Sequence, residues 1–264
     1  MMNSAKKNNV KLVGKLDGPT IIFAHGFGTD QNAWTKVSEA FLDNYRIILF
    51  DNVGGGASDP EAFSPNKYDS LKAYVDDLID ICIDYDVKDA IMIGHSVSGM
   101  IGLLTAIQRP EFFSKLILVG ASPRYLNDVD YFGGFEQQDL DALFDTMANN
   151  YFAWVSGFSA AAMANPENPH LAENFASTLN AIRPDIAQSV ARVIFQSDYR
   201  NELTKLDKPT LLIQAKEDIA VPLDVAQYLH KHVANSKLEV VNAYGHFPHM
   251  SAPDEIINSV KNFI

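Results

Sequence analysis

The stretch IMIGHSVSGMIGLLTAI, residues 91–107, passes from a short apolar run through a glycine-serine turn into a longer run of apolar and small residues. The first run has the length of a buried strand, and the second ends at Arg109-Pro110, as helices commonly end before a proline. Its centre, GHSVSG, is close to the pattern G-x-S-x-G, in which small residues allow a strained strand-to-helix turn to expose a serine hydroxyl. The stretch therefore predicts a strand, a sharp turn that carries a reactive serine, and a helix.

Two serines compete for this role. If Ser96 is the nucleophile, the small positions of the pattern are filled by Gly94 and Ser98. If Ser98 were the nucleophile, Met100 would have to fill the second small position, and its side chain is too bulky for the turn. We therefore predict Ser96 as the nucleophile. Serine in place of the second glycine is a mild departure from the pattern, although a positive φ there would disfavour it.

Apolar runs of strand length recur along the chain, several of them apolar at nearly every residue, which is typical of strands buried on both faces of a mostly parallel sheet. These runs lie at 20–23, 46–50, 90–93, 115–119, 210–214 and 237–241. Helical patterns lie between them, at 32–42, 70–85, 97–108, 222–233 and 253–263. This alternation predicts a doubly wound α/β fold.

One interval interrupts the alternation. Residues 122–207 contain no convincing core strand and show only helical patterns, such as NPHLAENFASTLNAI. We interpret this interval as a helical lid inserted over the strand ends. The predicted organisation is one core formed by residues 1–121 and 208–264, with the lid between them, and the length of 264 residues fits a single core.

In an open parallel sheet, ligands bind beyond the carboxyl ends of the strands, so the loops after the apolar runs are the places to look for chemistry. The loop after 210–214 supplies Asp218, and the loop after 237–241 supplies His246. Ser96, Asp218 and His246 follow the chain order of the α/β-hydrolase triad, in which serine attacks, histidine carries the proton and aspartate orients the histidine. We predict these three residues as catalytic.

Neighbouring residues remain alternatives for two of these positions. Glu217 adjoins Asp218, and a glutamate can serve in such triads; His249 follows three residues after His246. His95, beside the nucleophile, is interpreted as structural. Three histidines away from the strand-end loops are expected at the surface: His170, His230 and His232. No cluster of His, Cys and carboxylate residues in the sequence has the spacing of metal ligands.

The loop after 20–23 reads AHGFGTD and is where this architecture places a backbone N–H donor to an oxyanion. We predict the N–H groups of Phe27 and Val97 as the two donors. Dinucleotide binding is a rival interpretation, because glycines follow a strand here and Asp51 ends the next one. It requires a third glycine where Gln31 stands, so we expect no cofactor.

Composition limits the partners further. A net charge of −12 disfavours nucleic acid and anionic membrane surfaces, because both attract Lys and Arg. No segment approaches the ~20 apolar residues needed to span a bilayer, and the N-terminus lacks the apolar stretch of a secretory signal. The single cysteine, Cys82, fits a reducing compartment. We expect a cytoplasmic protein.

Several longer segments resemble the RsbQ-like branch of the α/β-hydrolases, which includes a bacterial stress regulator and the plant strigolactone and karrikin receptors. They are AHGFGTDQNAW, GHSVSGMIG, RPEFFSKLILVGASPRYLNDVDYFGGFE, RPDIAQSV, IFQSDYR and GHFPHMSAPDE. The resemblance covers nearly the whole chain, including the predicted lid. Serine two residues after the nucleophile is usual in the plant receptors, so Ser98 matches a habit of this branch.

The resemblance implies a pocket under a V-shaped lid of four helices, and the triad named above. The implied substrate-binding residues are His25, Phe27, Tyr125, Trp154, Phe158, Phe175 and Phe195. Two functions follow as hypotheses. The first is a serine hydrolase of small apolar esters or lactones such as butenolides, and the second is a small-molecule receptor that turns over slowly and acts through a protein signalling partner. The rate of turnover discriminates between them.

Overall fold

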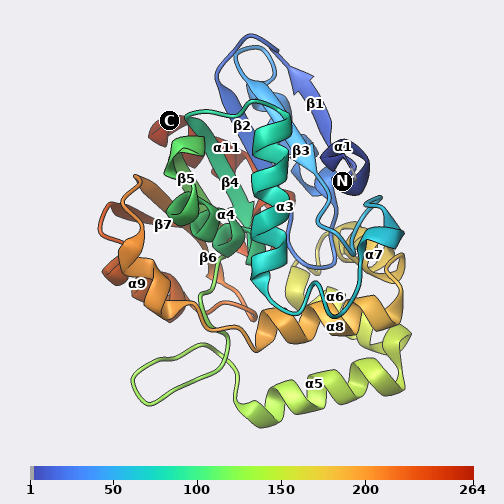
Figure 1. Ribbon diagram of the computed structural model, residues 1–264. Coiled ribbons are helices and arrows are strands. Elements are labelled where there is room, and N and C mark those ends of the chain that lie inside the picture. Colours follow the sequence, from blue (N-terminus) through green and yellow to red (C-terminus); the bar gives the residue numbers. More distant parts are fainter. Residues whose placement is uncertain (1–2) are drawn as a thin grey trace.

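The computed structural model describes residues 3–264, whose central feature is a seven-stranded sheet in the order β1-β3-β2-β4-β5-β6-β7. All neighbours pair in parallel except β1, which is antiparallel to β3. The strands are β1 (Lys11–Gly14), β2 (Thr20–Ala24), β3 (Arg46–Phe50), β4 (Ala90–His95), β5 (Phe113–Val119), β6 (Thr210–Glu217) and β7 (Ser236–Tyr244). The mostly parallel, doubly wound α/β fold predicted from the sequence is confirmed (Figure 1).

Helices cover both faces of this sheet. One face packs against α3 (Leu71–Asp84), α4 (Val97–Gln108) and α9 (Leu223–His232), and the other packs against α2 (Thr35–Ser38) and α11 (Pro253–Phe263). Two apolar layers result, as continuous apolar strands require. The short helices α1 (Ser4–Lys7) and α10 (Pro248–Ser251) complete this part of the chain.

Four helices lie between β5 and β6, and Figure 1 shows them gathered at one end of the sheet. They are α5 (Gln137–Asn149), α6 (Tyr151–Met163), α7 (Pro169–Asn180) and α8 (Pro184–Phe195). Helix α5 contacts α6 and α8, and α6 contacts α7. Asn150 and the capping box of Glu136 and Asp139 satisfy backbone N–H groups where α6 and α5 begin.

The sequence patterns did not predict β1 or the short helices α1 and α10, and they predicted one helix that is not continuous. Strand β1 has four exposed residues and therefore lacks the apolar signal of a buried strand. The helix predicted at 32–42 is instead a 3₁₀ turn at Gln31–Trp34, helix α2, and a second 3₁₀ turn at Glu39–Phe41. Its apolar spacing places side chains in the core without requiring a continuous α-helix.

Candidate active site

Ser96 lies in the sharp turn between β4 and α4, where it is 5% exposed. Its backbone has φ +55° and ψ −124°, a conformation that costs free energy in a residue with a side chain. A side chain at Gly94 would collide with the carbonyl of Ser98, so the first small position of the pattern is sterically required. The turn is held by the backbone hydrogen bond from Ser96 N to Val119 O, 2.8 Å long.

The structure brings Ser96, His246 and Asp218 together from three strand ends. His246 Nε2 lies 2.9 Å from Ser96 Oγ, and His246 Nδ1 lies 2.7 Å from Asp218 Oδ2. The other carboxylate oxygen, Asp218 Oδ1, accepts hydrogen bonds from the backbone N–H groups of Ala220 and Val221. This arrangement presents a serine hydroxyl to a base whose far nitrogen is held by a buried carboxylate.

The rival acid, Glu217, ends β6 with an exposed side chain, so its environment differs from that of Asp218. The rival base, His249, is fully buried in α10 and stacks on Trp34 with 4.3 Å between ring centroids. Neither ring nitrogen of His249 has a hydrogen-bond partner within residues 3–264. Burial, together with the nearby His246 and His25, lowers the pKa of His249 to about 3, so this ring is neutral at pH 7.

His246 is also fixed through its backbone. Its N–H donates a 2.7 Å hydrogen bond to the carbonyl oxygen of Ala162 at the end of α6, and its own carbonyl oxygen accepts one of 2.7 Å from His95 Nε2. Gly245 has φ +83° and abuts the carbonyl of Met163 so closely that a side chain would not fit. The loop that carries His246 is thus attached to α6. His95 is completely buried, and burial lowers the pKa of its imidazole well below the usual value.

The loop after β2 is held by two residues that the sequence patterns did not assign to the site. Asn52 donates its backbone N–H to His25 Nε2 and its side-chain N–H to the carbonyl oxygen of His25 and to Ser98 Oγ. Asp51 is 1% exposed and accepts from the backbone N–H of Gln31, among others. Both follow the apolar run of β3, so their position at a strand end was the signal available in the sequence.

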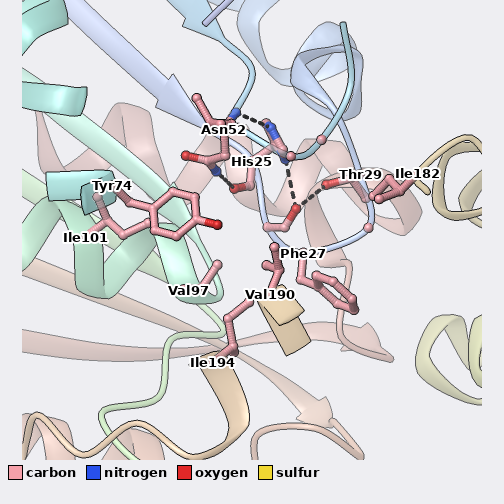
Figure 2. A pocket seen from close by; sticks show the side chains of 15 residues that line it. His25, Phe27, Thr29, Asn52, Tyr74, Val97, Ile101, Ile182, Val190 and Ile194 are labelled. Atoms are coloured by element: carbon pink, nitrogen blue, oxygen red, sulfur yellow. Dashed lines mark hydrogen bonds between the residues drawn. The ribbon is translucent and has the colours of Figure 1, made fainter. Parts of the chain in front are cut away.

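A pocket lies between the loop after β2 and the helices α3, α4 and α8 (Figure 2). It is bordered by both residues predicted to donate to an oxyanion, Phe27 and Val97, and its walls are mainly apolar. The lining residues are His25, Gly26, Phe27, Gly28, Thr29, Asn52, Val53, Gly54, Gly55, Tyr74, Val97, Ile101, Ile182, Val190 and Ile194. Tyr74, in α3, was not predicted, because its position in an amphipathic helix indicates only burial.

Of the predicted substrate-binding residues, His25 and Phe27 line this pocket and the five aromatic residues from the interval 122–207 do not. The hydroxyl oxygen of Tyr125 lies 3.5 Å from Ser96 Oγ, and the ring of Tyr125 packs edge-on against Phe195. Trp154 and Phe158 stack 5.0 Å apart. Phe175 packs 4.4 Å from Phe247, the residue after His246. An aromatic layer therefore adjoins the triad, and contact of these five residues with a ligand stays a prediction.

Within residues 3–264, no group of three or more His, Cys, Asp or Glu side chains is arranged to hold a metal ion. In the same range, no helix is both long enough and apolar enough to cross a membrane.

Comparison with known proteins gives concordant results. The family model described as alpha/beta hydrolase fold matches residues 19–253. A protein of Oryza sativa subsp. japonica that is named a probable esterase is 46% identical over 95% of this chain and 93% of its own length. The karrikin insensitive 2 receptor CA of Petunia hybrida is 44% identical over the same shares of both chains. The structure of a hydrolase from Oleispira antarctica, 32% identical, superposes with a TM-score of 0.95 over 99% of this chain and 96% of that one.

Proposed function

This chain belongs to the α/β hydrolase fold family and is a hydrolase, and from that premise we propose that it cleaves a small apolar ester or lactone with Ser96 as nucleophile. The observation that carries the proposal is the unbroken hydrogen-bonded series from Ser96 Oγ through His246 to Asp218, at 2.9 and 2.7 Å. The pocket beside it has mainly apolar walls, which favours an apolar substrate such as a butenolide.

In the proposed reaction, Ser96 Oγ attacks the carbonyl carbon of the ester while His246 Nε2 takes the hydroxyl proton. Asp218 keeps the imidazole in the required tautomer and stabilises its positive charge. The backbone N–H groups of Phe27 and Val97 donate to the developing oxyanion. The tetrahedral intermediate collapses to an acyl-serine and expels the alkoxide, which receives the proton from His246. A water molecule, deprotonated by His246, then attacks the acyl-serine. The second tetrahedral intermediate expels Ser96 Oγ, which takes the proton back from His246, and the acid is released.

A second function, that of a small-molecule receptor with slow hydrolysis, has two supports. The relative from Petunia is named as a receptor. In addition, the backbone of His246 is bonded to the end of α6 through Ala162, a contact by which a change at the base would reach the helices of residues 122–207. We propose that these helices act as a lid, that a protein signalling partner recognises its state, and that the protein acts in the cytoplasm.

A time course with a fluorogenic butenolide in excess tests both functions, with Ser96→Ala measured alongside. Sustained turnover that disappears in the variant supports the hydrolase. A burst of about one product per protein molecule, followed by near silence, supports the receptor. Equal product formation by both proteins contradicts the role of Ser96. Absence of product from both contradicts hydrolysis of this substrate class.

A further inference from the structure

The pocket contains one buried polar atom that the protein itself leaves without a partner. Tyr74 is 5% exposed, and its hydroxyl has no hydrogen-bond partner within residues 3–264. Figure 2 shows this hydroxyl directed toward the space that Val97 and Val190 border. A buried hydroxyl without a hydrogen-bond partner lowers the stability of the free protein, so a ligand atom that pairs with it would remove this cost on binding.

The other side-chain donors around this pocket are already engaged. His25 Nδ1 is hydrogen-bonded to the carbonyl oxygen of Gly26, and His25 Nε2 accepts a hydrogen bond from the backbone N–H of Asn52. Thr29 donates its hydroxyl to the same Gly26 carbonyl, and Asn52 donates its side-chain N–H to His25 and Ser98. The Tyr74 hydroxyl is therefore the side-chain donor in this pocket that remains available to a ligand.

The neighbouring Tyr68 differs from Tyr74, because its hydroxyl has a hydrogen-bond partner. The ring of Tyr68 lies 4.9 Å from that of Tyr74, yet its hydroxyl donates a 2.8 Å hydrogen bond to Asp77. Burial and the charge of Asp77 raise the pKa of Tyr74, so its hydroxyl keeps its proton and acts as a donor at neutral pH. Its complement is an uncharged acceptor oxygen, because the apolar walls around it would not compensate the desolvation of a charged group.

We propose that the pocket is a specificity subsite: it takes an apolar arm of the substrate that carries one uncharged oxygen acceptor, a ketone or an ether, and Tyr74 donates a hydrogen bond to that oxygen. This inference rests on the proposed function for the placement of the other end of the substrate. Both proposed oxyanion donors, Phe27 and Val97, border the same pocket, so an ester carbonyl bound to them lies at its mouth. Val190 and Ile194 of α8 and Ile101 of α4 would contact the arm.

Binding to the Ser96→Ala protein tests the subsite without hydrolysis. The probes are methyl heptanoate and its 4-oxo, 5-oxo and 6-oxo derivatives, which keep the chain length and move one ketone along it. Dissociation constants are measured by calorimetric titration for Ser96→Ala, for Ser96→Ala with Tyr74→Phe, and for Ser96→Ala with Tyr45→Phe. Tyr45 packs against Phe41 on the opposite face of the sheet and provides the matched control.

One oxo isomer is expected to bind about 3- to 10-fold more tightly than methyl heptanoate, as one hydrogen bond allows. Tyr74→Phe should abolish this preference and leave the affinity for methyl heptanoate within about twofold, whereas Tyr45→Phe should preserve it. The subsite is refuted if the preference survives Tyr74→Phe, if no isomer is preferred, or if none of the four esters binds. Wild-type protein that shows the preference but hydrolyses none of the esters would leave the subsite standing and refute the proposed function.

Discussion

The hydroxyl of Ser98 donates a 2.6 Å hydrogen bond to the carbonyl oxygen of His25. This bond joins the first turn of α4 to the loop after β2, and Asn52 reinforces it by donating to both groups. The proposed oxyanion donors lie on these two segments, Phe27 on the loop and Val97 in the helix. A glycine at position 98, as the G-x-S-x-G pattern specifies, would leave the two donor segments without this bond.

Ser98→Ala is therefore expected to lower kcat about 2- to 10-fold with little change in KM, because oxyanion donors act mainly in the transition state. Steady-state kinetics on a fluorogenic ester measure the effect. Ser259→Ala is the control, since it removes a buried hydroxyl that is bonded to Glu239 far from the site. A change in KM alone would show that Ser98 contributes to binding and does not position the donors.

Asp218→Asn is expected to reduce kcat about 10³- to 10⁴-fold, because the amide can hold the imidazole of His246 in the wrong tautomer and cannot stabilise its charge. Glu217→Gln, which changes the exposed neighbouring acid, should leave kcat within about twofold. Stopped-flow or initial-rate assays of the two variants decide between the carboxylates. The reverse order of effects would assign the role to Glu217.

His249 should make the fold sensitive to acid. Its pKa is about 3 in the folded protein against 6.5 ordinarily, so between these values the unfolded chain binds a proton that the folded chain does not. This contribution to stability is fully present above pH 6.5 and is lost as the pH falls toward 3. In urea unfolding at pH 7, 5.5 and 4.5, His249→Phe should lose less stability than wild type, while the exposed His170→Gln should follow wild type. Parallel curves for His249→Phe and wild type would contradict the assignment.

Tyr68 and Tyr74 should respond oppositely to loss of their hydroxyls. Tyr68→Phe removes the bond to Asp77, a carboxylate that also pairs with Lys7 at 2.9 Å, and should destabilise the protein by about 1–3 kcal/mol. Tyr74→Phe removes an unpartnered buried hydroxyl and should leave stability unchanged or slightly raised. Thermal unfolding of both variants at pH 7 checks the pair; destabilisation by Tyr74→Phe would show that its hydroxyl is already paired.

Most of the site could be predicted from the residues that follow the apolar runs of the strands. Ser96, Asp218 and His246 each follow a buried apolar run, and parallel pairing brings such ends to one edge of a sheet. The structure places the three within hydrogen-bond distance of one another. Local composition could also separate Ser96 from Ser98, because the turn tolerates only small residues around the nucleophile.

Other features could not be predicted, because they depend on contacts between distant segments and have no local pattern in the sequence. Tyr74 reads as one more buried residue of an amphipathic helix, and its free hydroxyl follows only from which side chains surround it. The bonds of Asn52 join the loop after β3 to the loop after β2 and to the first turn of α4. The exposed strand β1 is held by its pairing with β3, not by burial of its own side chains.

The attachment of His246 to α6 restricts how the proposed lid could open. The backbone hydrogen bond to Ala162 connects one end of α6 to His246. Asn165 makes a second connection, because its side-chain N–H donates to the carbonyl oxygens of Met163 and Tyr244. A motion that lifted this end of α6 would pull the imidazole away from Ser96. If the helices of residues 122–207 act as the proposed lid, an opening that preserves a working triad would keep the end of α6 at Met163 in place and swing the remaining helices about it.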